Sequence, residues 1–473
     1  MYLLRAFSSV LHTNKDLCNK FFVRFYAKNK NPYVKTWELF SKEIPALFNA
    51  SKQPITYPEH VDVVVIGGGF IGSSVAYWLN CRTGKGLSVV VLEKDLTYKD
   101  LQISSSLGTL TQHFSLPENI YLSQYSAEFF RNIKEHLGND VDLQYQPHNN
   151  LVLACEKYAE KLEKNVALQA EYGLHNKLIS SEDLKHRYPW LNTHDIKLGC
   201  TGIESEGTFN SLELLKGLVN KAQALGSVYI NAEVVGFELE KQRDVLMEGV
   251  LPGSFERINK VIYKTPDNEE HSIKFAACVL AAGDNSGNIA QLAKIGTCEG
   301  LLSIPLPIEK REYNVYSIKD KAKDMGLKVP IVTDTSGLWL QRNGLDSNLL
   351  CGHVPLVTEE TKDLSGEEYY ANVIKPPLIN RIQNCENAEV TLLTMEKQDI
   401  NTFDYSGIIG PHPYHNNLYI ATGFGKQGCL HAPGIGRAIA ELIVDSQYSK
   451  IDLSRLCFDR ILMNEPLVEF NIY

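Results

Sequence analysis

The ten cysteines of this 473-residue chain are scattered and contain no C-x-x-C pair. This spacing fits neither a zinc site nor a disulfide framework, so we expect reduced, mostly packed thiols. The chain has no run of about 18 apolar residues, which argues against a membrane-spanning helix. A formal net charge of -9 argues against general nucleic-acid binding, because that function needs a basic footprint.

Acidic residues are scarce at the start of the chain. Before Glu38 the only acid is Asp16, against seven lysines and arginines, with serines among apolar residues. This composition is typical of a mitochondrial presequence, and Arg24-Phe25-Tyr26-Ala27 resembles a matrix-protease site. A basic tail without a targeting role is the alternative. We predict a presequence over 1–26, an N-terminal extension over 27–59 and a location in the mitochondrial matrix, with peripheral attachment to the inner membrane left open.

A glycine-rich turn follows the first strongly apolar segment. Residues 61–66 form a β-branched run expected of a buried parallel strand. The next six residues satisfy G-x-G-x-x-G, an apolar helix start covers 73–80, and a second strand over 87–92 ends at an acid. This order predicts a dinucleotide-binding βαβ unit, with the pyrophosphate at the helix N-terminus and the acid on a ribose. Its predicted cofactor-binding residues are Gly67, Gly69, Phe70, Ile71, Gly72, Glu93 and Lys94.

Two later elements favour FAD over NAD. A strand over 275–283 ends in small residues, and a second glycine-rich segment, 418–428, precedes a helix expected from about Pro433 to Val444. A further strand over Val228–Leu239 is placed to cover the adenine. Each element alone is also compatible with a plain strand–turn–helix corner, but in this order they support one another. The predicted contacts to non-covalent FAD are Val234, Ala282, Gly283, Gly423, Phe424, Lys426, Gln427 and Gly428.

From Val61 to Ser449 these elements resemble the D-amino-acid oxidase/sarcosine oxidase superfamily of FAD oxidoreductases. More narrowly, residues 114–120, 401–404, 410–413 and 432–438 are similar to a mitochondrial branch associated with assembly of respiratory complex I. The resemblance implies an α/β fold, in which a Rossmann-type FAD-binding domain is interleaved with an α+β substrate domain carrying an antiparallel sheet.

The chain can be divided accordingly. We assign 60–150, 200–300 and 400–450 to the FAD-binding domain, 151–199 and 301–399 to the substrate-type domain, and 451–473 to a C-terminal tail. Helices are expected over 119–137 and 156–172, and strands over 304–318, 337–341 and 349–353. The resemblance also implies that the loop after the second strand lines the flavin, unless it is an ordinary serine-rich loop. The residues concerned are Ser104, Ser105, Ser106 and Gly108.

The chain departs from the pattern of active sarcosine-oxidase-like members. Leu350 and Leu430 stand where those members carry lysines, and Glu396 stands where a glycine is usual. Lys426 is then expected near the flavin carbonyls instead. We assign no catalytic residue. His113 and His431 either contact flavin or substrate or are simply hydrogen-bonded histidines, and Cys429 is interpreted as a packed thiol.

Two functions therefore stay open. In the first, the protein is a flavoprotein required for assembly or stability of complex I, with complex I subunits or other assembly factors as partners and weak or unknown redox activity. In the second, it is an FAD-dependent dehydrogenase or oxidase of a small amine or N-methyl amino acid. An NAD-linked dehydrogenase is disfavoured by the two later cofactor-facing elements.

Overall fold

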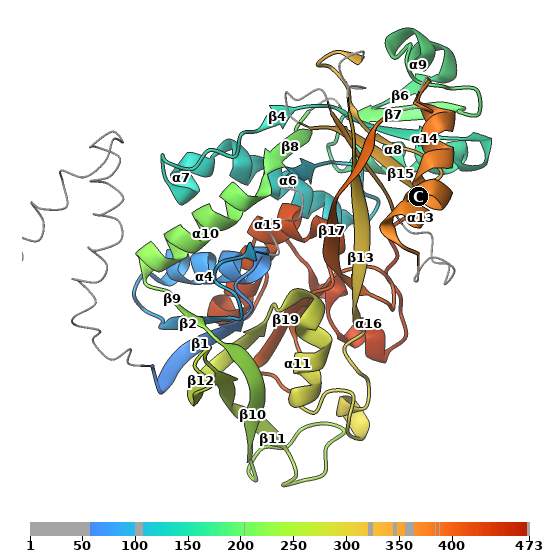
Figure 1. Cartoon of the computed structure of the whole chain (residues 1–473). Helices are drawn as coiled ribbons and strands as arrows, with labels where there is room; N and C mark the ends of the chain where they lie inside the picture. The colour runs from blue at the N-terminus through green and yellow to red at the C-terminus, as the bar shows by residue number, and fades with distance from the viewer. Residues whose placement is uncertain are drawn as a thin grey trace, which may run out of the picture. The chain divides into compact units, whose positions relative to one another are not determined.

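A computed structural model describes residues 57–99, 107–202, 204–319, 325–343, 348–354, 364–383, 385–386 and 388–470 (Figure 1). From Pro58 onward the chain forms one compact unit. The predicted presequence lies outside the described residues, as do nearly all of the N-terminal extension and the serines at 104–106.

The first sheet is built on parallel strands. In spatial order these are β9 (Val228–Asn231), β2 (Val89–Glu93), β1 (His60–Ile66), β12 (Glu270–Leu280) and β19 (Leu418–Thr422). The last four residues of β1 are buried, as expected for a central strand covered on both faces. The first part of β12 pairs antiparallel with β11 (Glu256–Lys264), which pairs with β10 (Glu233–Lys241), and β18 (Ile408–Pro411) pairs with β19. The segments 275–283 and 418–428, expected to face the cofactor, thus supply β12 and β19 of this sheet.

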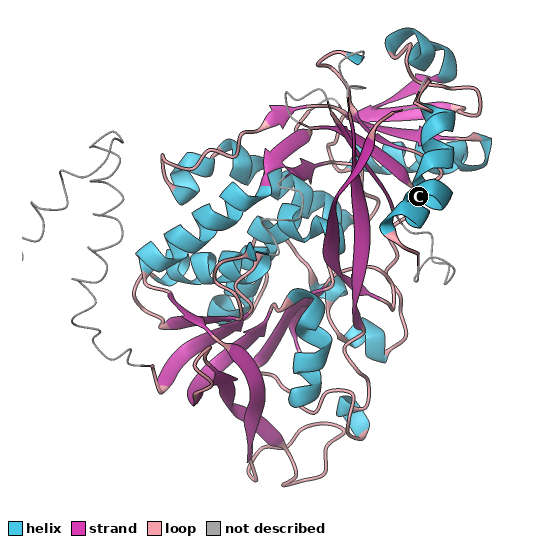
Figure 2. Ribbon diagram, viewed as in Figure 1, coloured by secondary structure: helices cyan, strands magenta, loops and turns pink. Residues whose placement is uncertain are grey.

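Three helices pack together over this sheet: α4 (Phe70–Thr83), α10 (Ser211–Leu225) and α15 (Gly428–Asp445). Figure 2 shows them grouped beside the strands of the first sheet. In α4 every residue from Gly72 to Asn80 is buried, because the helix lies between the sheet and the two other helices. Helix α11 (Ser286–Leu292) follows β12, and α6 (Pro117–Arg131) packs on α15.

Two expectations about these elements were wrong in detail. The segment 228–239 is not one strand: it breaks at Ala232 into β9, parallel to β2, and β10, antiparallel to β11. The alternating pattern continues through the break, so it carries no sign of the change of partner. Helix α15 begins at Gly428, five residues before the expected start, and Pro433 lies inside it. Proline is most frequent in the first turn of helices, so its position in the sequence is a misleading sign of where this helix starts.

The second sheet is mainly antiparallel, as predicted for the substrate-type domain. Its order is β17-β13-β16-β15-β14-β5-β7-β6, and only β14 and β5 run parallel. The strands are β5 (Asn150–Ala154), β6 (Asn176–Ser180), β7 (Leu198–Gly202), β13 (Ile308–Ile318), β14 (Ile331–Thr333), β15 (Leu338–Arg342), β16 (Leu349–His353) and β17 (Val390–Asn401). The inferred boundaries near 150 and 200 fall at β5 and within β7.

Helices cover this sheet, and a smaller sheet adjoins it. Helix α8 (Glu156–Glu171) packs on β5, β6 and β7 with its buried residues Ala159, Leu162 and Gln169. The other helices of this part are α9 (Ser181–Arg187), α13 (Gly366–Tyr369) and α14 (Lys375–Arg381), whereas the short helix α7 (Ile133–Leu137) packs on α6 and α10. The small sheet has the order β3 (Leu107–Leu110), β8 (Gly207–Asn210) and β4 (Gln146–Pro147).

The C-terminal segment packs on the rest of the unit. Helix α16 (Asp459–Leu462) and the residues before it bury Leu453, Leu456 and Phe458. Further on, the half-buried carboxylate of Glu469 accepts hydrogen bonds from the backbone N–H of Leu116 (3.2 Å) and from Asn119 Nδ2 (2.6 Å). The segment therefore satisfies donors at the start of α6, whose own N-cap residue supplies no side-chain acceptor.

We expect the stability of the fold to fall on acidification, partly through His412. Burial, followed by the nearby His415, lowers the pKa of His412 from 6.5 to about 3. In the unfolded chain this histidine is therefore protonated as the pH falls below about 6.5, whereas in the folded chain it stays neutral down to about pH 3. The stability of the fold is consequently lost as the pH falls from about 6.5 toward 3. One such group contributes about 1.4 kcal/mol per pH unit in that window.

The variant His412→Asn isolates this contribution. His412 Nδ1 accepts from the backbone N–H groups of Tyr414 and His415, both at 3.2 Å, and an asparagine oxygen can take the same bonds. Between pH 7 and pH 5 the free energy of unfolding should fall by about 2 kcal/mol less in the variant than in the wild type. Denaturant unfolding at both pH values measures this, and equal losses would contradict the assignment.

Candidate cofactor site

The loop between β1 and α4 is held by close backbone contacts. Gly67 has φ +97°, and a Cβ there would overlap the carbonyl oxygen of Ala281; a Cβ at Gly72 would overlap the carbonyl oxygen of Gly67. Gly67 N–H donates to Leu92 O (2.9 Å). These two glycines are therefore required by the protein itself, for a left-handed turn and for close helix packing.

Gly69 differs from its neighbours because a Cβ there would meet nothing within 4 Å. It is the N-cap of α4 with an ordinary φ of -68°, no side chain caps the helix, and the first turn carries no acid. The free N–H groups and the positive end of the helix therefore face open space. This is the space and the charge that a pyrophosphate requires.

Glu93 ends β2 beside this loop, at the position expected of the ribose-binding acid. Its carboxylate accepts from Gly68 N–H (2.6 Å) and Asp95 N–H (3.0 Å). Two further residues, not predicted from the sequence, support the loop: Ser73 Oγ and Tyr98 Oη donate to Gly68 O at 2.7 and 3.0 Å. Serine and tyrosine are common residues, so nothing in the sequence distinguishes these two hydroxyl donors from others.

The chain after β9 lies next to Glu93. Ala232 N–H donates to Glu93 O (2.8 Å), and Lys94 Nζ pairs with Glu233 at 2.7 Å, with both side chains exposed. Val234 is buried two residues further on. The predicted adenosine-side residues Glu93, Lys94 and Val234 are thus brought together.

The end of β12 reaches the same loop from the other side. Ala281 N–H donates to Ile66 O (2.9 Å). Gly283 has φ +55°, and a Cβ there would meet no atom within 4 Å. Thr422 Oγ1 donates to Gly283 O (3.2 Å), which joins Ala282 and Gly283 to the predicted turn at 423–428.

That turn is fixed by Asp399, a residue that the sequence analysis missed. Its carboxylate accepts from Gly423 N–H (2.6 Å), Gly425 N–H (3.1 Å) and Thr422 Oγ1 (3.1 Å). Burial raises the pKa of Asp399, and these hydrogen bonds oppose the rise. Asp399 lies on β17 in the second sheet, so only the tertiary structure pairs it with the turn.

The side chain of Lys426 extends from this turn toward the second sheet. Its Nζ lies 4.3 Å from the centre of the Trp339 ring. Desolvation by the surrounding protein lowers the pKa of Lys426, although Glu396 opposes the change. The residue is nevertheless exposed to solvent. Phe424 is buried, and Gln427 and Gly428 begin α15.

Other residues singled out from the sequence have structural explanations. Gly108 lies on β3, where a Cβ would overlap the Phe209 ring, while Ser105 and Ser106 lie outside the described residues. His113 Nε2 lies 3.1 Å from Glu206 Oε1, with both side chains buried. Burial acts to lower the pKa of His113, but the Glu206 charge prevails and raises it.

His431 and Cys429 are not drawn into a reactive arrangement. Burial lowers the pKa of His431 to about 3, and neither ring nitrogen has a hydrogen-bond partner among the described residues. Burial raises the pKa of the Cys429 thiol to about 11, which agrees with a packed thiol. Within the described ranges no cluster of side chains has the composition of a metal site, and no helix is long and apolar enough to cross a bilayer.

The fold and the glycine-rich loop after β1 together define a flavoprotein whose Rossmann-type domain is built from separate segments of the chain. A model of the family described as FAD dependent oxidoreductase (DAO) matches residues 62–442. The chain belongs to this family, and its cofactor is FAD. The open space at Gly69 and Gly283 and the free amides of α4 fit that group.

Individual relatives place the chain in a smaller group within this family. The chain is 43% identical over 423 residues to the FAD-dependent oxidoreductase domain-containing protein 1 homolog of Drosophila melanogaster, covering 88% of this chain and 82% of that protein. The Mus musculus protein of that name is 37% identical over 472 residues, with 94% and 95% covered. The narrower resemblance, to the proteins of this name, is thereby confirmed. Among solved structures, L-proline dehydrogenase from P. horikoshii matches with a TM-score of 0.70 at 22% identity, over 87% of this chain and 100% of that one, and supports the fold.

Proposed function

We propose that this flavoprotein supports assembly or stability of respiratory complex I in the mitochondrial matrix, and that it holds FAD with little turnover. The observation that carries the low turnover is the environment of two leucines. Leu350 and Leu430 stand where the resemblance expects lysines, and they are 2% and 0% exposed. A lysine needs water or a partner for its charge, so these positions cannot accept the expected cation without rearrangement.

The partners in this proposal are complex I subunits or other assembly factors. The resemblance of residues 114–120, 401–404 and 432–438 to the complex I-associated branch supports them. The acid-poor, serine-containing segment 1–26 supports the mitochondrial location.

A second candidate is an FAD-dependent dehydrogenase of a small amine, with an acceptor other than oxygen. Lys426 favours it, because an accessible cation on the cofactor turn, held over Trp339, can orient an anionic group. When bound, FAD supplies the hydride acceptor. The chain would contribute the cation that orients the substrate.

Anaerobic reduction separates the two candidates. Purified FAD-loaded protein is mixed with sarcosine, dimethylglycine, L-proline and D-amino acids, and loss of the oxidised flavin band is followed. The proposal expects no bleaching, and defective complex I assembly in cells in which Gly69→Val replaces the protein. Rapid bleaching by one substrate, with normal assembly in the Gly69→Val cells, would overturn it in favour of the dehydrogenase.

The variant Lys426→Met tests whether this cation interacts with the bound flavin. Methionine keeps most of the chain length over Trp339 but removes the charge. Because a nearby cation stabilises the reduced anionic flavin, we expect its midpoint potential to fall by tens of millivolts, an order of magnitude set by about 1 kcal/mol. The paired substitution Lys164→Met, on the exposed face of α8, serves as control. An unchanged potential in Lys426→Met would place the lysine away from the flavin.

A further inference from the structure

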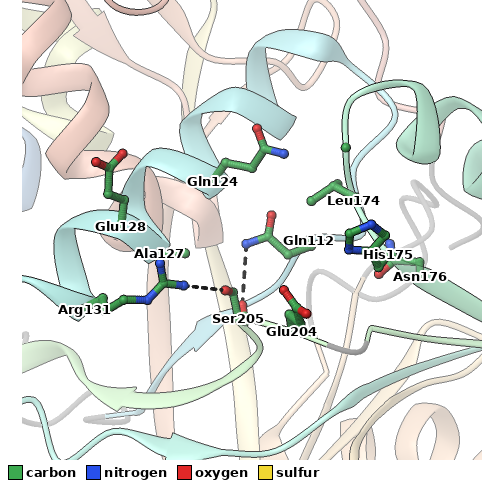
Figure 3. Close-up of a pocket in the computed structure, with 11 residues that line it drawn as sticks. Gln112, Gln124, Ala127, Glu128, Arg131, Leu174, His175, Asn176, Glu204 and Ser205 are labelled. Atoms are coloured by element: carbon green, nitrogen blue, oxygen red, sulfur yellow. Dashed lines mark hydrogen bonds between the residues drawn. The ribbon is translucent and has the colours of Figure 1, made fainter.

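A cavity of about 200 Å³ lies apart from the cofactor loop (Figure 3). One wall is the stripe Gln124, Ala127, Glu128 and Arg131 on α6, whose spacing puts these residues on one helical face. The remaining walls come from the chain after β3, from the turn between α8 and β6, and from the chain before β8. They contribute Gln112, Gly173, Leu174, His175, Asn176, Glu204 and Ser205.

Hydrogen bonds between its walls keep the cavity from collapsing. Gln124 Nε2 donates to Tyr172 O (2.9 Å) and fixes the turn at Gly173, which has φ +78°. On the opposite side Arg131 donates to Ser205 Oγ (3.3 Å). The α6 stripe is thus tied to both facing segments, and the space between them is part of the folded structure.

The floor of the cavity carries an acceptor without a protein donor. Gln112 is 2% exposed. Its Nε2 points to Ser205 O (3.5 Å), and its Oε1 has no hydrogen-bond partner among the described residues. Figure 3 shows this oxygen directed away from Ser205, toward Gln124 and Leu174. A buried carbonyl left without a donor destabilises the protein, so a ligand that donates to it removes that cost on binding.

The charge of the residues that line the cavity indicates which kind of hydrogen-bond donor the cavity favours. Two carboxylates, Glu128 and Glu204, and one guanidinium, Arg131, give a formal charge of -2 + 1 = -1 with histidine counted as neutral. The guanidinium is already engaged by Ser205. An acceptor at the floor and a carboxylate excess around it favour a positively charged donor. The volume is below the roughly 300–1,000 Å³ of drug-sized pockets, so the occupant has few heavy atoms.

We propose that this cavity binds a small organic ammonium ligand, with the ammonium group donating to Gln112 Oε1. The site is separate from the FAD loop and independent of the proposed function. His113, which directly follows Gln112 in the chain, lies beside the Glu206 carboxylate.

Binding of n-propylamine to the FAD-loaded full chain tests this proposal, with propanol and propionate as matched probes of similar shape. Ligand-observed NMR should detect propylammonium at millimolar concentration, with propanol and propionate at least about tenfold weaker, a difference of about 1.4 kcal/mol. Ala127→Leu should abolish binding by filling the cavity. Glu204→Gln, an exposed position, should weaken it several-fold, while Glu240→Gln on β10 of the first sheet should leave it unchanged.

Gln112→Leu removes the acceptor at nearly constant volume and should also abolish binding. Equal binding of propanol and propylammonium, no binding of any probe, or full binding in Ala127→Leu would each overturn the proposal. Amine bound at the flavin instead would shift the flavin absorption band and survive Ala127→Leu, so the two sites are distinguishable. Failure here leaves the FAD assignment untouched, because the flavin spectrum is read in the same samples.

Discussion

Gly69→Val is expected to give a folded protein that no longer retains FAD. A Cβ at Gly69 meets no protein atom within 4 Å, and φ is -68°, so valine fits the protein alone. The same open space is where the pyrophosphate must approach the backbone, and valine methyl groups would occupy it. We expect affinity for FAD to fall by at least about a hundredfold, or about 2.7 kcal/mol.

Gly72→Val is the informative contrast for this prediction. Its Cβ would overlap the carbonyl oxygen of Gly67, so this variant should fail to fold. Gly236→Ala, where the added atom meets only ordinary contacts on β10, should keep both fold and cofactor. Flavin content of the purified protein and its far-UV circular dichroism measure the outcome. Stoichiometric FAD in folded Gly69→Val would show that the cofactor does not lie against this loop.

Arg460→Met is expected to produce the largest loss of stability among single changes in the C-terminal segment. Arg460 Nε lies 2.7 Å from Asp404 Oδ2, with both side chains buried, and the guanidinium also donates to Leu456 O (2.6 Å) and Gly407 O (3.0 Å). The variant leaves the buried Asp404 charge without its partner. Breaking such a pair costs about 3–5 kcal/mol.

Chemical denaturation measures this loss. The double variant Asp404→Asn/Arg460→Met should recover part of the stability, because no unpaired charge is then left in the core. Lys164→Met, which breaks an exposed pair with Glu160, should change the stability little, because solvent screens such a pair. A loss in Arg460→Met no greater than in Lys164→Met would mean that the C-terminal segment is not held by this pair.

Local sequence patterns were sufficient to predict the βαβ unit. The β-branched run at 61–66, the three glycines and the acid at 93 lie within one short stretch, where strand, turn and helix follow directly from neighbouring residues. The helices at 117–137 and 156–171 and the strand at 349–353 were found for the same reason. The break at Ala232 was missed because a strand pattern records which residues are apolar and not which strand lies beside them.

The sequence by itself determined that this chain carries a glycine-rich nucleotide loop, and the order of the later elements indicated FAD. Only the tertiary structure decided which residues hold the second turn and where the unusual positions point. Asp399 reaches Gly423 and Gly425 across two sheets, and both Leu350 and Leu430 are buried. The physical reason is range: backbone conformation responds to adjacent residues, whereas burial, pKa and the partner of a charge depend on segments brought together by folding.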